Sequence, residues 1–231
     1  MNSTKTTARF AGLLYLLFSI LAVFGYMYIP AAFVVSGDAA ATARKITEGE
    51  LMYRVGILAS LVGHLLFIFL VLTLYQLFKD VDKRQARLMV ALVCVGVAAE
   101  IVSLANRTAP LLLLSGASFL SVFTKPQLDA LALGFLRLGN NLGQLLTAFW
   151  GLWLFPFGIL TIRSRFLPKI LGVLLMVAGV GYVVTCVVRI VFPAQIHVVS
   201  QVLTPLYFGE LPIIFWLLIM GAKVPQAEAQ A

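Results

Sequence analysis

The sequence has few charged residues and few cysteines for its length. Of 231 residues, 11% are Asp, Glu, Lys or Arg, where about 25% is usual for a soluble domain. Apolar residues make up 61%, which excludes a disordered chain, and a water-soluble fold of this size could not bury so much apolar surface. The two cysteines are too few for a disulfide-rich secreted module. The chain is therefore expected to fold in lipid.

The sequence contains long apolar segments with few charged residues. A transmembrane helix needs about 20 mostly apolar residues, because the hydrocarbon is about 30 Å thick and each residue rises about 1.5 Å. The runs are too long for barrel strands and show no period-two alternation. The sequence predicts an all-α, polytopic transmembrane helix bundle forming a single integral membrane domain over residues 1–231, with a disordered tail at 224–231. The six membrane-spanning helices are expected at residues 10–28, 55–78, 88–114, 131–162, 169–192 and 202–221.

Basic residues are distributed unevenly between the predicted loops. Ten Lys and Arg fall on one side of the membrane and four on the other, and three more lie within or at the ends of spans. Because cytoplasmic loops carry the excess of positive charge, both termini are expected in the cytoplasm (N-in/C-in). The first span follows Lys5 and Arg9, which also fits a cleaved signal peptide, but its length favours a retained anchor. The net charge of +8 then reflects topology and attraction to membrane lipids, and no nucleic-acid partner is expected.

Capping and breaking residues predict where several helices begin and bend. The segment Ser36-Gly-Asp38 is expected to cap a short Ala-rich helix that ends near Gly49. Residues Thr124 to Gln127 are typical of a capping box before the fourth span. A helix from Lys125 to Ile162 would measure about 57 Å, more than a bilayer needs. We expect it to project, tilt or break, with residues 139–143 as the weakest stretch and Pro156 as a second bending point.

Polar side chains inside the spans form two helical stripes. Ionisable and amide groups are costly in lipid, so they are expected to face the bundle interior or a water-filled cavity. The polar residues of the third and fourth spans follow one face each. Counted from the cytoplasmic ends, the glutamates lie near the midplane and the arginines at the outer rim, which predicts an outward-facing polar pocket. Its ligand-binding candidates are Glu100, Ser103, Arg107, Arg137, Asn140, Asn141, Gln144, Arg189, Glu210 and His64.

A purely structural interpretation stays open for each of these residues. Arginines near span ends reach the interface, amides bridge helices, and a lone histidine is more often a satisfied interior residue than a ligand. Each glutamate could be ion-paired with an arginine or kept neutral. No metal and no cofactor are expected, because Cys94 and Cys186 lie in apolar spans without a neighbouring cysteine. We expect no catalytic residue either.

The order and spacing of several short motifs carry a resemblance to a known family. Those segments are Arg9 to Leu17, Tyr53 to Gly56, Leu74 to Phe78, Leu113 to Gly116, Leu167 to Gly172, and Gly209-Glu210 before Leu217. Over about residues 9–221 the chain resembles a bacterial membrane protein family known as domain of unknown function 4386. The resemblance implies a six-helix protein of the bacterial inner (plasma) membrane, and it supplies no activity, cofactor or catalytic residue.

Three functions remain open from the sequence. The favoured hypothesis is a pocket for a small anionic or amphiphilic ligand, because guanidinium groups suit carboxylates and phosphates. The alternative is a small proton-coupled transporter that uses Glu100 or Glu210, and a homo-oligomer is compatible with it. The second alternative is an intramembrane enzyme acting on a lipid-like substrate. It is disfavoured because no catalytic motif is found, and because His64 and His197 fall on different elements, with His197 in the loop after Pro193.

Overall fold

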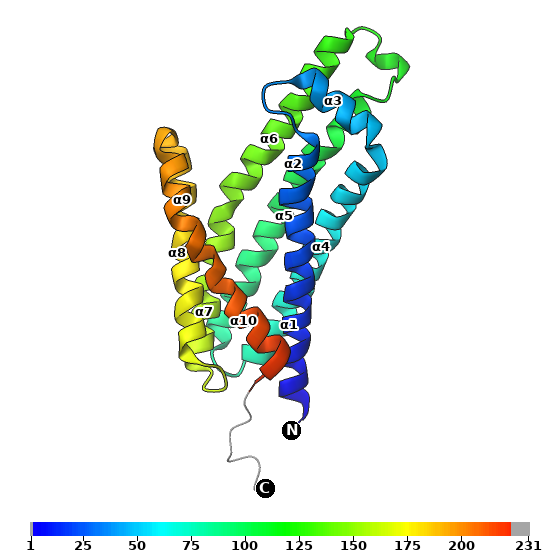
Figure 1. Ribbon diagram of the computed structural model, residues 1–231. Helices are drawn as coiled ribbons and strands as arrows, with labels where there is room; N and C mark the ends of the chain where they lie inside the picture. The colour runs from blue at the N-terminus through cyan, green and yellow to red at the C-terminus, as the bar shows by residue number, and fades with distance from the viewer. Residues whose placement is uncertain (1, 223–231) are drawn as a thin grey trace, which may run out of the picture. The chain divides into compact units, whose positions relative to one another are not determined.

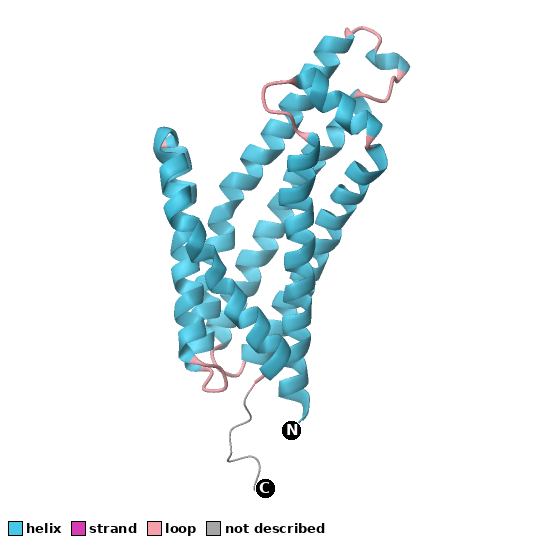
Figure 2. Cartoon of the chain, viewed as in Figure 1, coloured by secondary structure: helices cyan, strands magenta, loops and turns pink. Residues whose placement is uncertain are grey.

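A computed structural model of the protein describes residues 2–222, and the described chain consists of helices joined by short loops without a strand (Figure 2). The predicted tail at 224–231 lies outside this range. Six helical segments are long and apolar enough to cross a membrane, which confirms the six-helix, all-α prediction. These segments are Thr4–Phe33, Glu50–Phe78, Lys83–Leu113, Lys125–Arg163, Lys169–Val191 and Pro193–Met220.

The helices follow one another as labelled in Figure 1. The α-helices are α1 (Asn2–Val23), α2 (Ile29–Phe33), α3 (Ala39–Glu48), α4 (Glu50–Phe78), α5 (Lys83–Leu113), α6 (Lys125–Leu152), α7 (Leu154–Arg163), α8 (Lys169–Val191), α9 (Ile196–Tyr207) and α10 (Leu211–Phe215). Short 3₁₀ turns are η2 (Ser118–Leu120), η3 (Pro193–Gln195) and η4 (Phe208–Glu210), and π turns are η1 (Phe24–Tyr28) and η5 (Trp216–Met220).

Several helix boundaries differ from the sequence prediction, most of all those of the first and last spans. The first span continues from α1 through η1 into α2, because all these residues keep helical dihedral angles. The last span begins earlier than predicted, since Pro193 opens a 3₁₀ turn that leads directly into α9. His197 therefore lies in the first turn of α9, and its predicted place in a loop is wrong. Proline suits such a first turn because the missing N–H would have no helical partner there.

The fourth span is interrupted at Trp153, three residues before Pro156, the second bending point that the sequence predicts, and not within residues 139–143, the stretch expected to be weakest. Helix α6 runs unbroken through that stretch and ends at Leu152. Pro156 has no N–H for the carbonyl of Leu152, which explains why the interruption comes one turn before the proline. The glycine at 139 serves close packing instead, because a Cβ there would lie 3.1 Å from the Ser103 carbonyl oxygen.

The capping residues act as the sequence predicts. The side chain of Asp38 accepts a hydrogen bond of 2.8 Å from the amide of Ala41 and so caps α3. The amide of Thr124 donates to Oε1 of Gln127 over 2.8 Å at the start of α6. Each side chain satisfies or covers backbone groups that lack an intrahelical partner, so the local sequence fixes these two helix starts.

The described chain divides into two compact units. The first combines the chain up to Leu17, residues Leu66–Val97, and the chain from Leu145 onward; the second combines Phe18–Leu65 with Ala98–Gln144. Helices α1, α4, α5 and α6 each contribute residues to both units. The expectation of a single membrane domain stays a prediction.

Aromatic side chains and glycines build the first unit. Trp153 is 2% exposed, and its ring contacts those of Tyr15, Phe67 and Phe157 at centroid distances of 5.9, 5.1 and 5.3 Å. Helix α8 lies beside α7 and α9 (Figure 1). Small residues let helix backbones approach closely in a membrane, and a Cβ at Gly172 would lie 2.5 Å from the carbonyl oxygen of Gly158 on α7.

The second unit is built around the start of α4. Its buried cluster joins residues from α2, α3, α4 and α6, and the rings of Phe33 and Tyr53 meet at 5.4 Å. Helix α3 is amphipathic and buries Ile46 in this cluster. The cluster consists of Ile29, Phe33, Ile46, Tyr53 and Leu136. It packs α2 and α3 against α4 and α6.

Candidate functional site

The polar stripes of α5 and α6 meet in the second unit. The hydroxyl of Ser103 on α5 donates a hydrogen bond of 2.7 Å to the carbonyl of Gly139 on α6. One turn further along α6, a Cβ at Gly143 would lie 3.9 Å from both carboxylate oxygens of Glu100. Because glycine occupies both positions, α6 can approach the polar face of α5 closely.

A pocket of about 360 Å³ lies in this unit and is lined by both stripes. Arg107 from α5 and Arg137 and Asn140 from α6 line it together with Tyr53 from α4. The remaining lining residues are Ile29, Pro30, Val34, Ser36, Leu133 and Leu136. The pocket therefore combines two guanidinium groups and an amide with a largely apolar wall, the composition of a small-ligand site with a few orienting polar groups.

The π turn at the end of α1 holds Arg107. The amide of Ile29 bonds to the carbonyl of Phe24, and the next residue, Pro30, has no N–H. The carbonyl of Gly25 therefore lacks a helical donor, and Nη1 of Arg107 donates to it over 2.8 Å. Turns of this kind occur often at functional sites.

Aromatic contacts hold Arg107 further in place. Its guanidinium carbon lies 4.4 Å from the ring centroid of Tyr26, a cation–π contact. The hydroxyl of Tyr53 donates over 2.7 Å to the backbone carbonyl of Arg107. One of the five N–H donors of the guanidinium is thus used by Gly25, and the group still lines the pocket.

Arg137 and Asn140 differ from Arg107 in having no protein partner. No described residue forms a hydrogen bond or ion pair with either side chain, and both are exposed. They lie three residues apart on α6, on the side that lines the pocket. A guanidinium and an amide that have no partner in the described part of the chain are free to bind a ligand or to reach lipid headgroups.

A buried polar chain accompanies the pocket in the second unit. Glu100 and His64 are each 2% exposed. The hydroxyl of Tyr26 donates to Oε2 of Glu100 over 3.0 Å and lies 3.3 Å from Nε2 of His64. Tyr26 therefore contacts both this polar chain and Arg107 of the pocket.

The other candidate residues are distributed between the units. Asn141, which is exposed, and Gln144, which is half-buried, continue along α6 in the second unit. Arg189 and Glu210 belong to the first unit. Arg189 is half-buried, and its Nε has no hydrogen-bond partner among the described residues. The second unit therefore contains every sequence-predicted candidate except these two.

Glu210 has its own partners at the 3₁₀ turn of the last span. It ends the η4 turn, one residue before α10 and two before Pro212. The hydroxyl of Tyr15 donates a hydrogen bond to its carboxylate, and Tyr182 lies close to it. Tyr182 in turn stacks on Tyr207 with a centroid distance of 4.2 Å. The hydrogen-bond donor to Glu210 is thus a tyrosine, where the sequence left an arginine ion pair as one alternative.

Tyrosine is the residue type that sequence reasoning missed. Hydroxyls that donate to polar groups of other helices belong to Tyr15, Tyr26 and Tyr53. The predicted stripes consist of charged, amide and serine side chains, and they leave the tyrosines among the apolar residues. A usable signal existed, because a tyrosine deep in a span needs a partner for its hydroxyl. Among the described residues no group of three His, Cys, Asp or Glu is placed to hold a metal ion.

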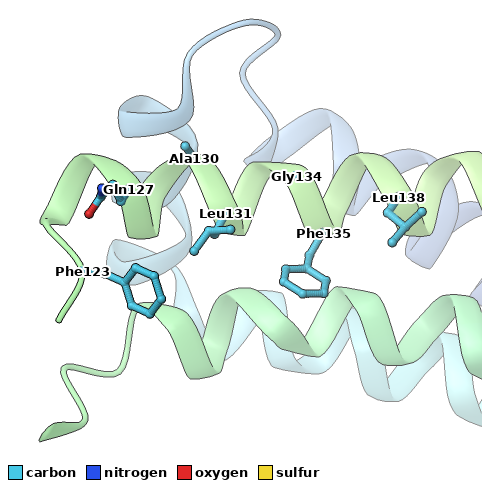
Figure 3. A pocket seen from close by; sticks show the side chains of 7 residues that line it. All are labelled: Phe123, Gln127, Ala130, Leu131, Gly134, Phe135 and Leu138. Atoms are coloured by element: carbon cyan, nitrogen blue, oxygen red, sulfur yellow. The ribbon is translucent and has the colours of Figure 1, made fainter. Parts of the chain in front are cut away.

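A second hollow in the same unit is apolar. It measures about 510 Å³ and lies along the first turns of α6, where Leu131, Phe135 and Leu138 project to one side with Phe123 from the preceding loop (Figure 3). Its only polar lining side chain is that of Gln127. Such a surface suits lipid acyl chains and offers no group that selects a particular ligand.

Comparison with known proteins identifies the family without an activity. The family described as "Domain of unknown function (DUF4386)" matches residues 10–221. An "Uncharacterized protein" of Archaeoglobus fulgidus is 33% identical over 79 residues, which cover 34% of this chain and 45% of that protein. The chain thus matches less than half of that relative's length. No solved structure matches. With six apolar helices and a match over nearly its whole length, the chain is a multi-pass membrane protein that belongs to the DUF4386 family.

Proposed function

We propose that the pocket of the second unit binds a small anionic ligand with an apolar part. The observation that carries the proposal is the convergence of Arg107 and Arg137 on one pocket of about 360 Å³ with an apolar wall. Two guanidinium groups offer paired N–H donors to a carboxylate, phosphate or sulfonate. Ile29, Leu133 and Leu136 offer contact to the apolar part of the ligand.

The geometry favours an anion over other ligands. Glu100, the buried acid of this unit, is hydrogen-bonded to Tyr26 and does not line the pocket. The charged side chains that line the pocket are both cationic. A cation would meet two like charges there, whereas an anion would neutralise charges that are costly to keep in an apolar span. The competing explanation is that Arg137 reaches the phosphates of ordinary lipids.

By the positive-inside pattern, the pocket lies in the outer half of the protein and both termini lie in the cytoplasm. The family resemblance supports the inner membrane of a bacterium as the location. A ligand would then enter from outside the cell or from the outer leaflet. This placement fits sensing, storage or presentation of the ligand to a partner.

Thermal unfolding in nanodiscs of zwitterionic phosphatidylcholine tests the proposal. Octanoate, octyl phosphate and octanesulfonate are the anionic probes, and octanol and octyltrimethylammonium are controls of equal chain length. We expect the three anions, and neither control, to raise the unfolding temperature. Whichever of octanoate and octyl phosphate gives the larger rise carries the preferred headgroup. Substituting Arg107→Gln together with Arg137→Gln should abolish the rise. An equal rise in wild type and double variant would overturn the pocket.

Transport remains a second proposal, supported by the position of Glu210 within the last span. Glu210 ends the η4 3₁₀ turn and directly precedes α10, and carboxylates within membrane spans serve as proton relays in pumps and transporters. The test is uptake of radiolabelled octanoate into liposomes driven by a pH gradient. Uptake that Glu210→Gln abolishes would support transport, and the absence of gradient-driven uptake would contradict it.

A further inference from the structure

The buried chain of Glu100, Tyr26 and His64 has no role in anion binding as described so far. Tyr26 connects the other two residues, with its hydroxyl 3.0 Å from Oε2 of Glu100 and 3.3 Å from Nε2 of His64. Its ring also lies beneath the guanidinium of Arg107, with 4.4 Å between the ring centroid and the guanidinium carbon. One side chain therefore links the two buried titratable groups to the anion pocket.

The backbone assigns the proton on His64. Nδ1 of His64 lies 2.7 Å from the carbonyl oxygen of Ser60, one turn earlier on α4. A carbonyl oxygen only accepts hydrogen bonds, so Nδ1 carries a proton in this arrangement. When the imidazole is neutral, Nε2 is then a pure acceptor and faces the hydroxyl of Tyr26.

When Glu100 is ionised and His64 neutral, the hydroxyl of Tyr26 cannot donate to both of them. The hydroxyl has a single hydrogen to donate, yet it lies within hydrogen-bond distance of two acceptors. Both contacts become hydrogen bonds only if one partner gains a proton. Either Glu100 is protonated and donates to the Tyr26 oxygen, or Nε2 of His64 is protonated and donates to it. In both forms Tyr26 donates its own hydrogen to the other partner.

The charges around the chain connect this proton to the pocket. Arg107 of α5 lies over Tyr26, and the other charged or titratable side chains lining the pocket are Arg137 of α6 and Tyr53 of α4. Without a ligand, an ionised Glu100 partly balances the charge of Arg107. An anion bound to the guanidinium supplies that balance instead, and an ionised Glu100 then adds a second negative charge in a region of low dielectric constant.

We propose that the Glu100–Tyr26–His64 chain takes up one proton when an anion binds at Arg107 and Arg137. The proton comes from solvent and resides on a Glu100 oxygen or on Nε2 of His64, and the Tyr26 hydroxyl exchanges it between the two. No covalent bond other than these O–H and N–H bonds changes. The inference rests on the proposed anion site, and it makes that site a proton-coupled one.

Calorimetry with octanesulfonate in phosphatidylcholine nanodiscs tests the proposal. This probe stays ionised across the neutral range, so any proton taken up is bound by the protein. The binding heat is measured at one neutral pH in two buffers that differ in their heat of ionisation. For the wild-type protein we expect uptake on the order of one proton per bound anion, and an affinity that falls by up to about tenfold per pH unit as the pH rises.

Two matched tyrosine variants locate the proton. Tyr26→Phe keeps the ring beneath Arg107 but removes the connecting hydroxyl, so proton uptake should fall to a small fraction of the wild-type value while binding remains measurable. Tyr15→Phe removes a hydroxyl that bonds the other buried carboxylate, Glu210, and should keep the wild-type proton number. If Tyr26→Phe does not fold, Glu100→Gln replaces it, with the same expected loss of proton uptake.

The outcomes separate the two proposals. No binding heat in either buffer would overturn the anion site and this inference together. Binding with equal apparent heats in the two buffers would leave the anion site intact and overturn proton uptake. Wild-type proton uptake retained in Tyr26→Phe or Glu100→Gln would overturn the assignment of the proton to this chain.

Discussion

Substituting alanine for Gly172 tests how closely α7 and α8 approach. The new methyl carbon would lie 2.5 Å from the carbonyl oxygen of Gly158 and 2.6 Å from Cγ1 of Ile162. Nonbonded atoms of this kind settle at about 3.5 Å, so the helices must separate by roughly 1 Å. Overpacking of this size reduces the free energy of unfolding by about 1–3 kcal/mol. The gain in helix propensity from glycine to alanine, about 1 kcal/mol at most, offsets only part of that loss.

Equilibrium unfolding in mixed micelles, followed by tryptophan fluorescence, measures the effect. The matched control is Gly134→Ala on α6, because a Cβ at Gly134 would meet nothing within 4 Å. We expect Gly172→Ala to be destabilised and Gly134→Ala to be unchanged or slightly stabilised. If the two variants unfold alike, the close approach of α7 and α8 is refuted. The result would also explain the glycine in the segment Leu167 to Gly172 as a packing requirement.

Three further predictions concern a buried carboxylate, a helix cap and the topology. Tyr15→Phe removes one hydrogen-bond donor to Glu210 and should lower the free energy of unfolding by about 1–3 kcal/mol. The control is Tyr28→Phe, because Tyr28 is 53% exposed. It should change the free energy of unfolding by less than about 0.5 kcal/mol. The amide of Gln85, with Arg163 nearby, holds the pKa of Asp82 below its ordinary value. Ionised Asp82 therefore stabilises the folded protein above its unfolded-state pKa of about 3.9. The unfolding temperature of wild type should exceed that of Asp82→Asn there, and this difference should shrink as the pH falls through the folded-state pKa. A difference that does not depend on pH would contradict the prediction. In intact cells of a variant without Cys94 and Cys186, an impermeant maleimide should label Ser121→Cys and not Asp80→Cys; the reverse pattern would contradict the predicted orientation.

The sequence predicts the elements of this fold better than their breaks. Six spans follow from the length and hydropathy of the apolar runs, and Asp38 marks the start of α3 because a cap is a local interaction. The sequence ranks residues 139–143 as a weaker point than Pro156, whereas the helix is interrupted near Pro156, because the contact of Gly139 with Ser103 and the burial of Trp153 depend on helices far away in the sequence. From sequence alone, a glycine in a helix is interpreted as a weak point, because the residue that packs against it is unknown.

The candidate site shows the same division between local and distant information. Helical spacing predicts that Glu100, Ser103 and Arg107 share a face, and the structure brings that face to α6. The reason Arg107 binds the carbonyl of Gly25 is local too, since Pro30 leaves that carbonyl without a helical donor. What spacing cannot provide is the choice of partners between helices, such as Tyr26 for Glu100 and Tyr15 for Glu210.

A crystal structure of the protein with 8-bromo-octanoate would show whether the pocket binds an anion, because the anomalous signal of bromine locates the apolar end of the ligand. We expect the bromine beside Leu133 and Leu136, and the carboxylate within about 3 Å of a guanidinium nitrogen of Arg107 or Arg137. A ligand bound elsewhere, with Arg137 directed to lipid headgroups and Arg107 paired with Glu100, would contradict this expectation.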